Sequence, residues 1–150
     1  MTTIETVKGF IHQLCADAGA DPEAAYSPEN EAWYFEKGAI TLEVFMVSYH
    51  TGSPDERTFL RCFSNILPIP IESTQRQELY QIALEVNARN MGVKIGMMAD
   101  KGFLYAIGER DIYGMNYAEF VTLISDVAYW AEKLGEMLRG RFGESSSNLN

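Results

Sequence analysis

The chain has 150 residues, a formal net charge of −9 from 12 Lys and Arg against 21 Asp and Glu, and a hydrophobic fraction of 47%. This length and its aromatic content (8 Phe, 8 Tyr and 2 Trp) predict one folded domain over residues 1–142 rather than a disordered chain. We expect the Ser- and Asn-rich tail, residues 143–150, to be disordered. The acidic charge argues against nucleic acid or an anionic membrane as the main partner, because both select for surplus Lys and Arg.

The first residues lack the basic and apolar regions of a secretory signal, and no apolar run reaches the roughly 20 residues of a membrane span. Cys15 and Cys62 are too few for a secreted disulfide framework. We expect two buried free thiols, with a single bridge between them as the alternative. The sequence therefore predicts a cytoplasmic protein with no membrane span.

The first predicted element is an amphipathic helix over Thr2–Ala18, because apolar residues recur there every three or four positions. Gly19 and Pro22 follow as helix-ending signals. Residues 19–30 are then predicted to form a polar loop.

Three strands are predicted next, over Glu31–Phe35, Ala39–His50 and Arg57–Ser64. The second strand has one uninterrupted apolar face, which predicts burial: Ile40, Leu42, Val44 and Met46. Its opposite face starts with polar residues and becomes apolar toward the end of the strand: Thr41, Glu43, Phe45, Val47 and Tyr49. Pro68 and Pro70 make the segment Ile66–Ile71 unsuited to a central strand or a helix, so we expect an extended crossing segment there.

The remaining chain is predicted to form a helix (Thr74–Asn90), a hairpin (Val93–Met97 and Phe103–Ile107) and a last helix (Asn116–Arg139). Thr74 with Gln77, and Asn116 with Glu119, have the spacing of a helix-capping box. Strand alternation places Met97 in the core. The element order, with its short links, predicts an α+β fold in which helices pack on a mostly antiparallel sheet.

Patterns for known catalysis are missing from the sequence, which has no phosphate-binding glycine loop, nucleophile elbow or zinc-protease motif. His12 and Cys15 lie three residues apart on a predicted helix, but a second pair of metal ligands is missing. Glu109 and Asp111 resemble an acid–base pair, yet 21 acidic residues produce such pairs by chance. We therefore expect no catalytic residue, metal site or cofactor, and a protein that is not an enzyme.

Element order, size and acidity resemble the type III secretion chaperone-like fold, over about Ile4–Arg139. Within it, the sequence resembles the YbjN family, named for bacterial sensory transduction regulators, and is most similar to its cyanobacterial members. The segments that carry this resemblance are Glu31–Ala39, Arg57–Leu60, Leu67–Pro70, Leu84–Asn87 and Met115–Ala131. The resemblance implies a non-enzymatic regulatory module that forms a homodimer, with no established catalytic residues.

Three hypotheses for the function remain open. The first is a protein-binding or regulatory module of YbjN type, which the segments Trp33–Gly38 and Leu67–Pro70 favour. The second is a secretion chaperone that binds an extended segment of another protein. The third is a small-molecule sensor, or an enzyme, with a pocket that the sequence does not reveal.

The candidate partner-binding residues are Tyr34, Phe45, Val47 and Tyr49. Strand pairing across Gly38 would bring Tyr34 beside the other three, which would form one aromatic surface. Exposed apolar surfaces of this kind usually mark a binding site, and self-association would cover it. The alternative is that Ile66–Ile71, or a helix, covers this surface within the monomer.

Overall fold

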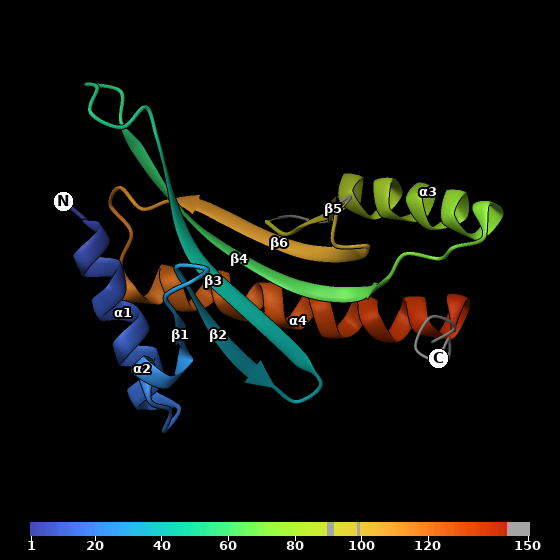
Figure 1. The fold of residues 1–150 in the computed structure, drawn as a ribbon, viewed down its shortest axis with the longest axis horizontal. Helices are drawn as coiled ribbons and strands as arrows, with labels where there is room; N and C mark the ends of the chain where they lie inside the picture. The colour runs from blue at the N-terminus through green and yellow to red at the C-terminus, as the bar shows by residue number, and fades with distance from the viewer. Residues whose placement is uncertain (90–91, 99, 144–150) are drawn as a thin grey trace.

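The computed structural model describes residues 1–89, 92–98 and 100–143. Within these residues, four helices and six strands follow one another (Figure 1). Their order is α1 (Ile4–Asp17), α2 (Pro22–Ala25), β1 (Tyr26–Ser27), β2 (Ala32–Lys37), β3 (Ile40–Tyr49), β4 (Arg57–Pro68), α3 (Ser73–Arg89), β5 (Lys94–Met98), β6 (Phe103–Asp111) and α4 (Tyr117–Phe142).

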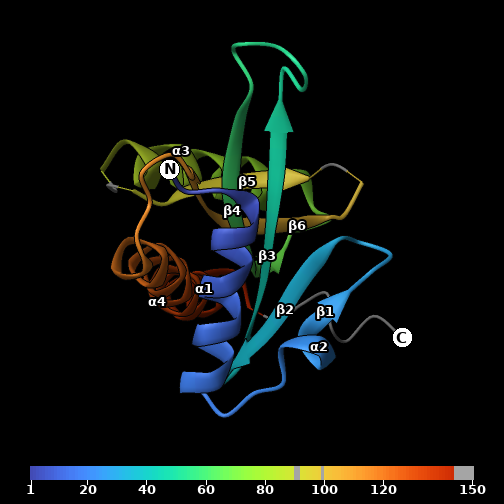
Figure 2. The same cartoon turned by 90° about the vertical axis from the view of Figure 1, so that its left-hand side faces the viewer.

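The strands form a single antiparallel sheet in the order β1-β2-β3-β4-β6-β5. The long helix α4 runs across β4 and β6, and α1 crosses near the start of α4 on the same side of the sheet (Figures 1 and 2). The predicted α+β class is confirmed. Helices cover one face of the sheet, which we call the inner face.

The inner face carries the main hydrophobic core. In β3, Leu42 and Val44 are buried, and Ile40 and Met46 pack against the same cluster from partly buried positions. The helices contribute apolar side chains to this cluster: Val7, Ile11, Leu79, Ala83, Phe120, Ile124, Val127 and Leu134. The burial predicted from the alternation in β3 is therefore confirmed.

Side-chain caps hold the ends of the two core helices. Thr3 accepts a hydrogen bond from the Thr6 backbone N–H at the start of α1. Asn116 and Glu119 form the predicted capping box, which satisfies two N–H groups that the first turn of α4 leaves without helical partners. Gly143 ends α4 with a φ of 68°, and the rest of the predicted tail, residues 144–150, lies outside the described residues.

The third predicted strand is longer than expected. Strand β4 continues to Pro68, with a register shift between Asn65 and Leu67, so the prediction of a crossing segment from Ile66 is wrong up to Pro68. The pairing of β3 with β4 stops at Ser64, and beyond it β4 has only β6 as a neighbour. A proline is compatible with a strand there, because it interrupts no second ladder.

The start of α3 also differs from the prediction, because the cap is Glu72 rather than Thr74 with Gln77. The Glu72 carboxylate accepts hydrogen bonds from the backbone N–H groups of Thr74 at 2.9 Å and Gln75 at 2.7 Å. These bonds lower the pKa of Glu72. The predicted end of this helix, Asn90, lies outside the described residues.

Two short elements occur where only a loop was predicted, namely α2 and the two-residue strand β1. The prediction that Met97 is a core residue is wrong, because its side chain is 46% exposed. Met97 lies on β5, an edge strand of the sheet, where its sulfur accepts a hydrogen bond from the Tyr80 hydroxyl. An edge position leaves one side of the residue without a neighbouring strand to bury it.

Candidate protein-binding face

The face of the sheet opposite the helices carries a row of aromatic side chains. We call this surface the aromatic face; its residues are Tyr34, Phe45, Val47, Tyr49, Phe59, Phe63 and Tyr105. They project from β2, β3, β4 and β6 at alternate positions of the strand pairs, so they share one side of the sheet. Three of them, Phe45, Phe63 and Tyr105, form a second cluster with Ile107, Met98 and Phe103, and the described helices contribute no side chain to it.

The rings of the aromatic face contact one another across the strands. The Phe63 ring lies 5.4 Å from Phe45 and 5.9 Å from Tyr105, measured between ring centroids. At the far end of the face, Tyr49 meets Phe59 edge-to-face at 5.7 Å. Such cross-strand aromatic pairs stabilise a sheet. Phe63 and Tyr105 are buried, Phe45 and Phe59 are partly buried, and Tyr49 is exposed.

Two arginines lie over these rings. The guanidinium carbon of Arg61 lies 4.8 Å from the Phe63 centroid and 5.7 Å from that of Phe45. Arg57 stacks over Phe59 at 5.2 Å in the same way. Arginine and aromatic residues are the side chains most enriched among the energetically important contacts of protein interfaces.

Carboxylates from β6 pair with these arginines. Glu109 lies 3.1 Å from Arg61 and 2.6 Å from Lys94, and Asp111 lies 2.6 Å from Arg57. A hydrogen bond from Lys94 is the main cause of the lowered pKa of Glu109. The pKa of Asp111 is lowered first by the Tyr113 backbone N–H and then by Arg57. Both carboxyl groups are therefore ionised at neutral pH, as partners of these cations in ion pairs.

A hollow of about 320 Å³ opens on the aromatic face between Tyr34, Phe45, Phe63 and Tyr105. The Tyr34 hydroxyl donates to Glu43 at 3.2 Å and accepts from the Asn30 amide at 3.0 Å. Partial burial is the main cause of the raised pKa of Tyr34 and of Tyr105, with Glu43 adding to both. Both phenols therefore remain protonated donors at neutral pH.

All four candidate partner-binding residues lie on this face. Tyr34, Phe45 and Val47 are partly buried, and Tyr49 is 47% exposed. Two residues of the segment considered as a cover, Ile66 and Leu67, belong to the inner cluster instead.

Sequence reasoning missed three further members of the face: Phe59, Phe63 and Tyr105. Phe59 and Phe63 alternate with Leu60 and Cys62 in the sequence. Only the pairing of β4 with both β3 and β6 shows that they share one side of the sheet with Tyr105.

The residues considered for metal binding do not converge. His12 is exposed whereas Cys15 is buried, and among residues 1–89, 92–98 and 100–143 no three His, Cys, Asp or Glu side chains cluster as metal ligands. Cys15 and Cys62 are both buried and free. Burial raises the pKa of Cys62 to about 12 and is the main cause of the raised pKa of Cys15. In the part of the chain that the structure describes, no helix has the length and hydropathy needed to cross a bilayer.

Comparison with known proteins gives matches at the level of structure. No protein-family model and no curated protein sequence matches this chain. The ExsC–ExsE complex superposes with a TM-score of 0.61 at 10% identity, over 92% of this chain and 97% of the other. The HopA1–SchA chaperone–effector complex gives a TM-score of 0.61 at 11% identity, over 87% and 93%.

This chain has the type III secretion chaperone-like fold. YbjN from E. coli, described as a candidate transcription regulator, superposes with a TM-score of 0.53 at 12% identity, over 89% of this chain and 88% of the other. None of these three structures is named for a catalytic activity. At such low identities the likeness concerns the fold, and the function has to be argued from the surface of this chain.

Proposed function

We propose that this chain is a cytoplasmic, non-enzymatic protein-binding module of YbjN type that forms a homodimer through its aromatic face. One observation carries the proposal: the helices cover one side of the sheet, and the other side presents aromatic rings with arginines stacked over them. A solvated sheet face ordinarily alternates to polar side chains, so a row of rings there favours contact with protein.

The charges of this face support a second copy of the chain as the occupant. Two copies with net charges of −9 repel one another as whole molecules. The ion-paired cluster on the aromatic face does not share this negative charge, because it combines three cations with two carboxylates: Arg57, Arg61, Lys94, Glu109 and Asp111. In a two-fold contact each copy offers both partners of an ion pair, so one face can complement itself.

A secretion chaperone that binds an extended segment is the second candidate. The observation in its favour is the free edge of β2. Strand β1 pairs only with Ala32 and Trp33, so among the described residues Tyr34–Lys37 have a strand neighbour, β3, on one side alone. An extended peptide adds to such an edge through backbone hydrogen bonds. The chaperone–effector complex among the structural neighbours supports this candidate at the level of fold.

The substitution Val47→Lys tests the homodimer. It places an ammonium group in the middle of the aromatic face, where Val47 pairs with Phe59 across the strands. Gln13→Lys on the exposed side of α1 adds the same charge away from the sheet and is the matched control. We expect wild type and the control to sediment as dimers, and Val47→Lys to sediment as a monomer with an unchanged circular dichroism spectrum.

A second variant separates loss of the interface from loss of the fold. Tyr49→Lys alters a side chain that is already 47% exposed, so the monomer tolerates the change. A monomeric wild-type protein, or dimers that persist in both lysine variants, would contradict self-association through this face. The chaperone candidate would be favoured by two results together. The dimers would persist in both variants, and an added extended peptide would broaden the amide signals of Tyr34–Lys37.

A further inference from the structure

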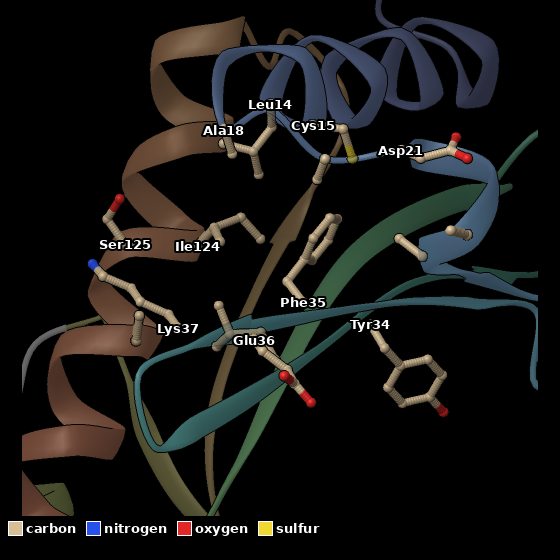
Figure 3. A pocket seen from close by; sticks show the side chains of 15 residues that line it. Leu14, Cys15, Ala18, Asp21, Tyr34, Phe35, Glu36, Lys37, Ile124 and Ser125 are labelled. Atoms are coloured by element: carbon tan, nitrogen blue, oxygen red, sulfur yellow. The ribbon is translucent and has the colours of Figure 1, made fainter.

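A second hollow lies between α1, α2, β2 and α4 (Figure 3). It shares Tyr34 with the aromatic face. Its volume is about 530 Å³, which is within the range of small-molecule pockets, roughly 300–1,000 Å³. We call it the β2 hollow. Leu14, Phe35, Lys37, Ile124 and Ser125 are among the residues that line it.

The walls of the β2 hollow are apolar. Leu14 and Cys15 from α1, Phe35 from β2 and Ile124 from α4 face one another across it (Figure 3). Five alanines complete the lining, and their short side chains leave the space between the elements unfilled: Ala18, Ala20, Ala24, Ala25 and Ala128. Walls of this composition favour an aliphatic chain over a polar ligand.

The polar groups of the β2 hollow are unevenly placed. Figure 3 shows the side chains of Lys37 and Ser125 on the same side of the hollow, one from β2 and one from α4. The Glu36 carboxylate and the Tyr34 hydroxyl point away from the apolar walls (Figure 3). Asp21 lies on the other side and accepts a hydrogen bond from the Glu23 backbone N–H, which caps α2.

Lys37 is the cation among the lining residues, which also include the carboxylates of Asp21 and Glu36. Among the described residues, no carboxylate pairs with it in a salt bridge. Its ammonium group and the Ser125 hydroxyl together supply donors for an anionic head group. A ligand that matches both parts of the hollow has an aliphatic chain ending in a carboxylate.

We propose that the β2 hollow binds a medium-chain aliphatic carboxylate, with its carboxylate at Lys37 and Ser125 and its chain against Leu14, Phe35 and Ile124. Binding at this site does not depend on the aromatic face. It would make the chain a small-molecule sensor in addition to a protein-binding module.

Titration calorimetry with hexanoate, octanoate and decanoate, each below its micelle concentration, tests this proposal. We expect affinity to rise about fourfold for each added CH₂ group, since each buries apolar surface in the hollow. Octylamine has the same chain with the opposite charge, and we expect it to bind at least about tenfold more weakly than octanoate. Octylamine that binds as tightly as octanoate would contradict the role of Lys37.

Two variants locate the site. Lys37→Met removes the ammonium group, and we expect it to weaken octanoate about tenfold while leaving 1-octanol unchanged. Ala18→Leu fills the hollow from an exposed position of the lining and should weaken both ligands. Lys101→Met removes an equal charge beside the hollow of the aromatic face and serves as the control.

Amide chemical shifts supply an independent readout. We expect octanoate to shift the backbone signals of Phe35–Lys37 and Ile124–Ala128, and to leave those of Phe59–Phe63 in place. Three results would overturn the proposal. They are a failure of octanoate to bind at millimolar concentration, equal binding to Lys37→Met and to wild type, and shifts of the signals of the aromatic face instead.

Discussion

The carboxamide of Asn87 in α3 forms two hydrogen bonds with the backbone of Ile95 in β5. Its Nδ2 donates to the Ile95 carbonyl oxygen at 2.9 Å, and its Oδ1 accepts from the Ile95 N–H at 2.6 Å. Strand β5 is an edge of the sheet, and Ile95 is paired to Ala106 of β6 across the strands. One side chain thus occupies a position where another strand would otherwise pair, which protects the edge from adding a foreign chain.

Replacing Asn87 by Leu removes both of these hydrogen bonds. The N–H and the carbonyl of Ile95 then lose their partner in a half-buried setting, so we expect the free energy of unfolding to fall by about 2 kcal/mol. Urea denaturation measures this loss, and amide exchange at Ile95 should become faster. Gln81→Leu, on an exposed position of the same helix, is the control. Unchanged exchange at Ile95 would show that the carboxamide does not protect this edge.

Replacing Val44 by Asp should abolish folding. Val44 is fully buried in the inner cluster, and a carboxylate without a partner costs several kcal/mol there, on the order of the whole stability of a domain. Thermal unfolding followed by circular dichroism checks this. Thr41→Asp places the same group on the exposed side of the same strand and should melt close to wild type. A Val44→Asp protein that melts within a few degrees of wild type would refute the burial of this position.

Stability at alkaline pH should depend on Tyr117. Its hydroxyl donates to Asp17 Oδ2 at 2.7 Å, joining the first turn of α4 to the end of α1, and this bond is the main cause that raises the pKa of Tyr117 to about 12. Because the pKa is raised in the folded state, this hydrogen bond contributes fully to the free energy of unfolding below pH 10, the ordinary pKa of a tyrosine. The contribution is lost as pH rises from 10 through 12.

The variant Tyr117→Phe isolates this contribution. We expect it to lower the free energy of unfolding by about 0.5–1 kcal/mol at pH 8, because it removes one exposed hydrogen bond. The difference between variant and wild type should shrink toward zero by pH 12. A difference that stays constant from pH 8 to pH 12 would show that the hydroxyl–carboxylate bond is not its source.

Thiol chemistry tests the two cysteines. Because burial raises the pKa of both thiols, to about 12 for Cys62, neither is a reactive thiolate at pH 8. We expect slow reaction of the native protein with a disulfide reagent and two thiols per chain after denaturation. Metal analysis of protein purified without added ions should give well under one equivalent of zinc or copper. Fewer than two thiols after denaturation, or one equivalent of metal, would overturn this expectation.

Alternation was enough to predict the central strand of the inner face. Leu42 and Val44 lie in a strand that is paired on both sides and covered by helices, so their burial follows from side-chain periodicity alone. The same rule was wrong for Met97, because periodicity assigns a side chain to a face but does not show whether the strand is at an edge.

The end of β4 and the aromatic face depend on contacts between distant segments. The strand passes Ser64 and reaches Pro68 because β6 pairs with it there, and β6 begins 35 residues later, at Phe103. The cap of α3, by contrast, is formed by a residue next to the helix in the sequence, and the prediction still named the wrong residue. Glu72 reaches the N–H groups of Thr74 and Gln75 with a longer side chain than the Ser, Thr, Asp or Asn of the usual pattern.

The aromatic face belongs to a chain with a net charge of −9, so two copies of the chain carry charge of the same sign. At about 0.01 M salt the screening length is about 30 Å, so two approaching copies repel before their faces meet. At about 0.1 M it is about 10 Å, and this long-range barrier shrinks while the short contacts between rings and guanidinium groups persist. Association through this face should therefore become faster and tighter as salt is added, which is opposite to the behaviour of two oppositely charged partners.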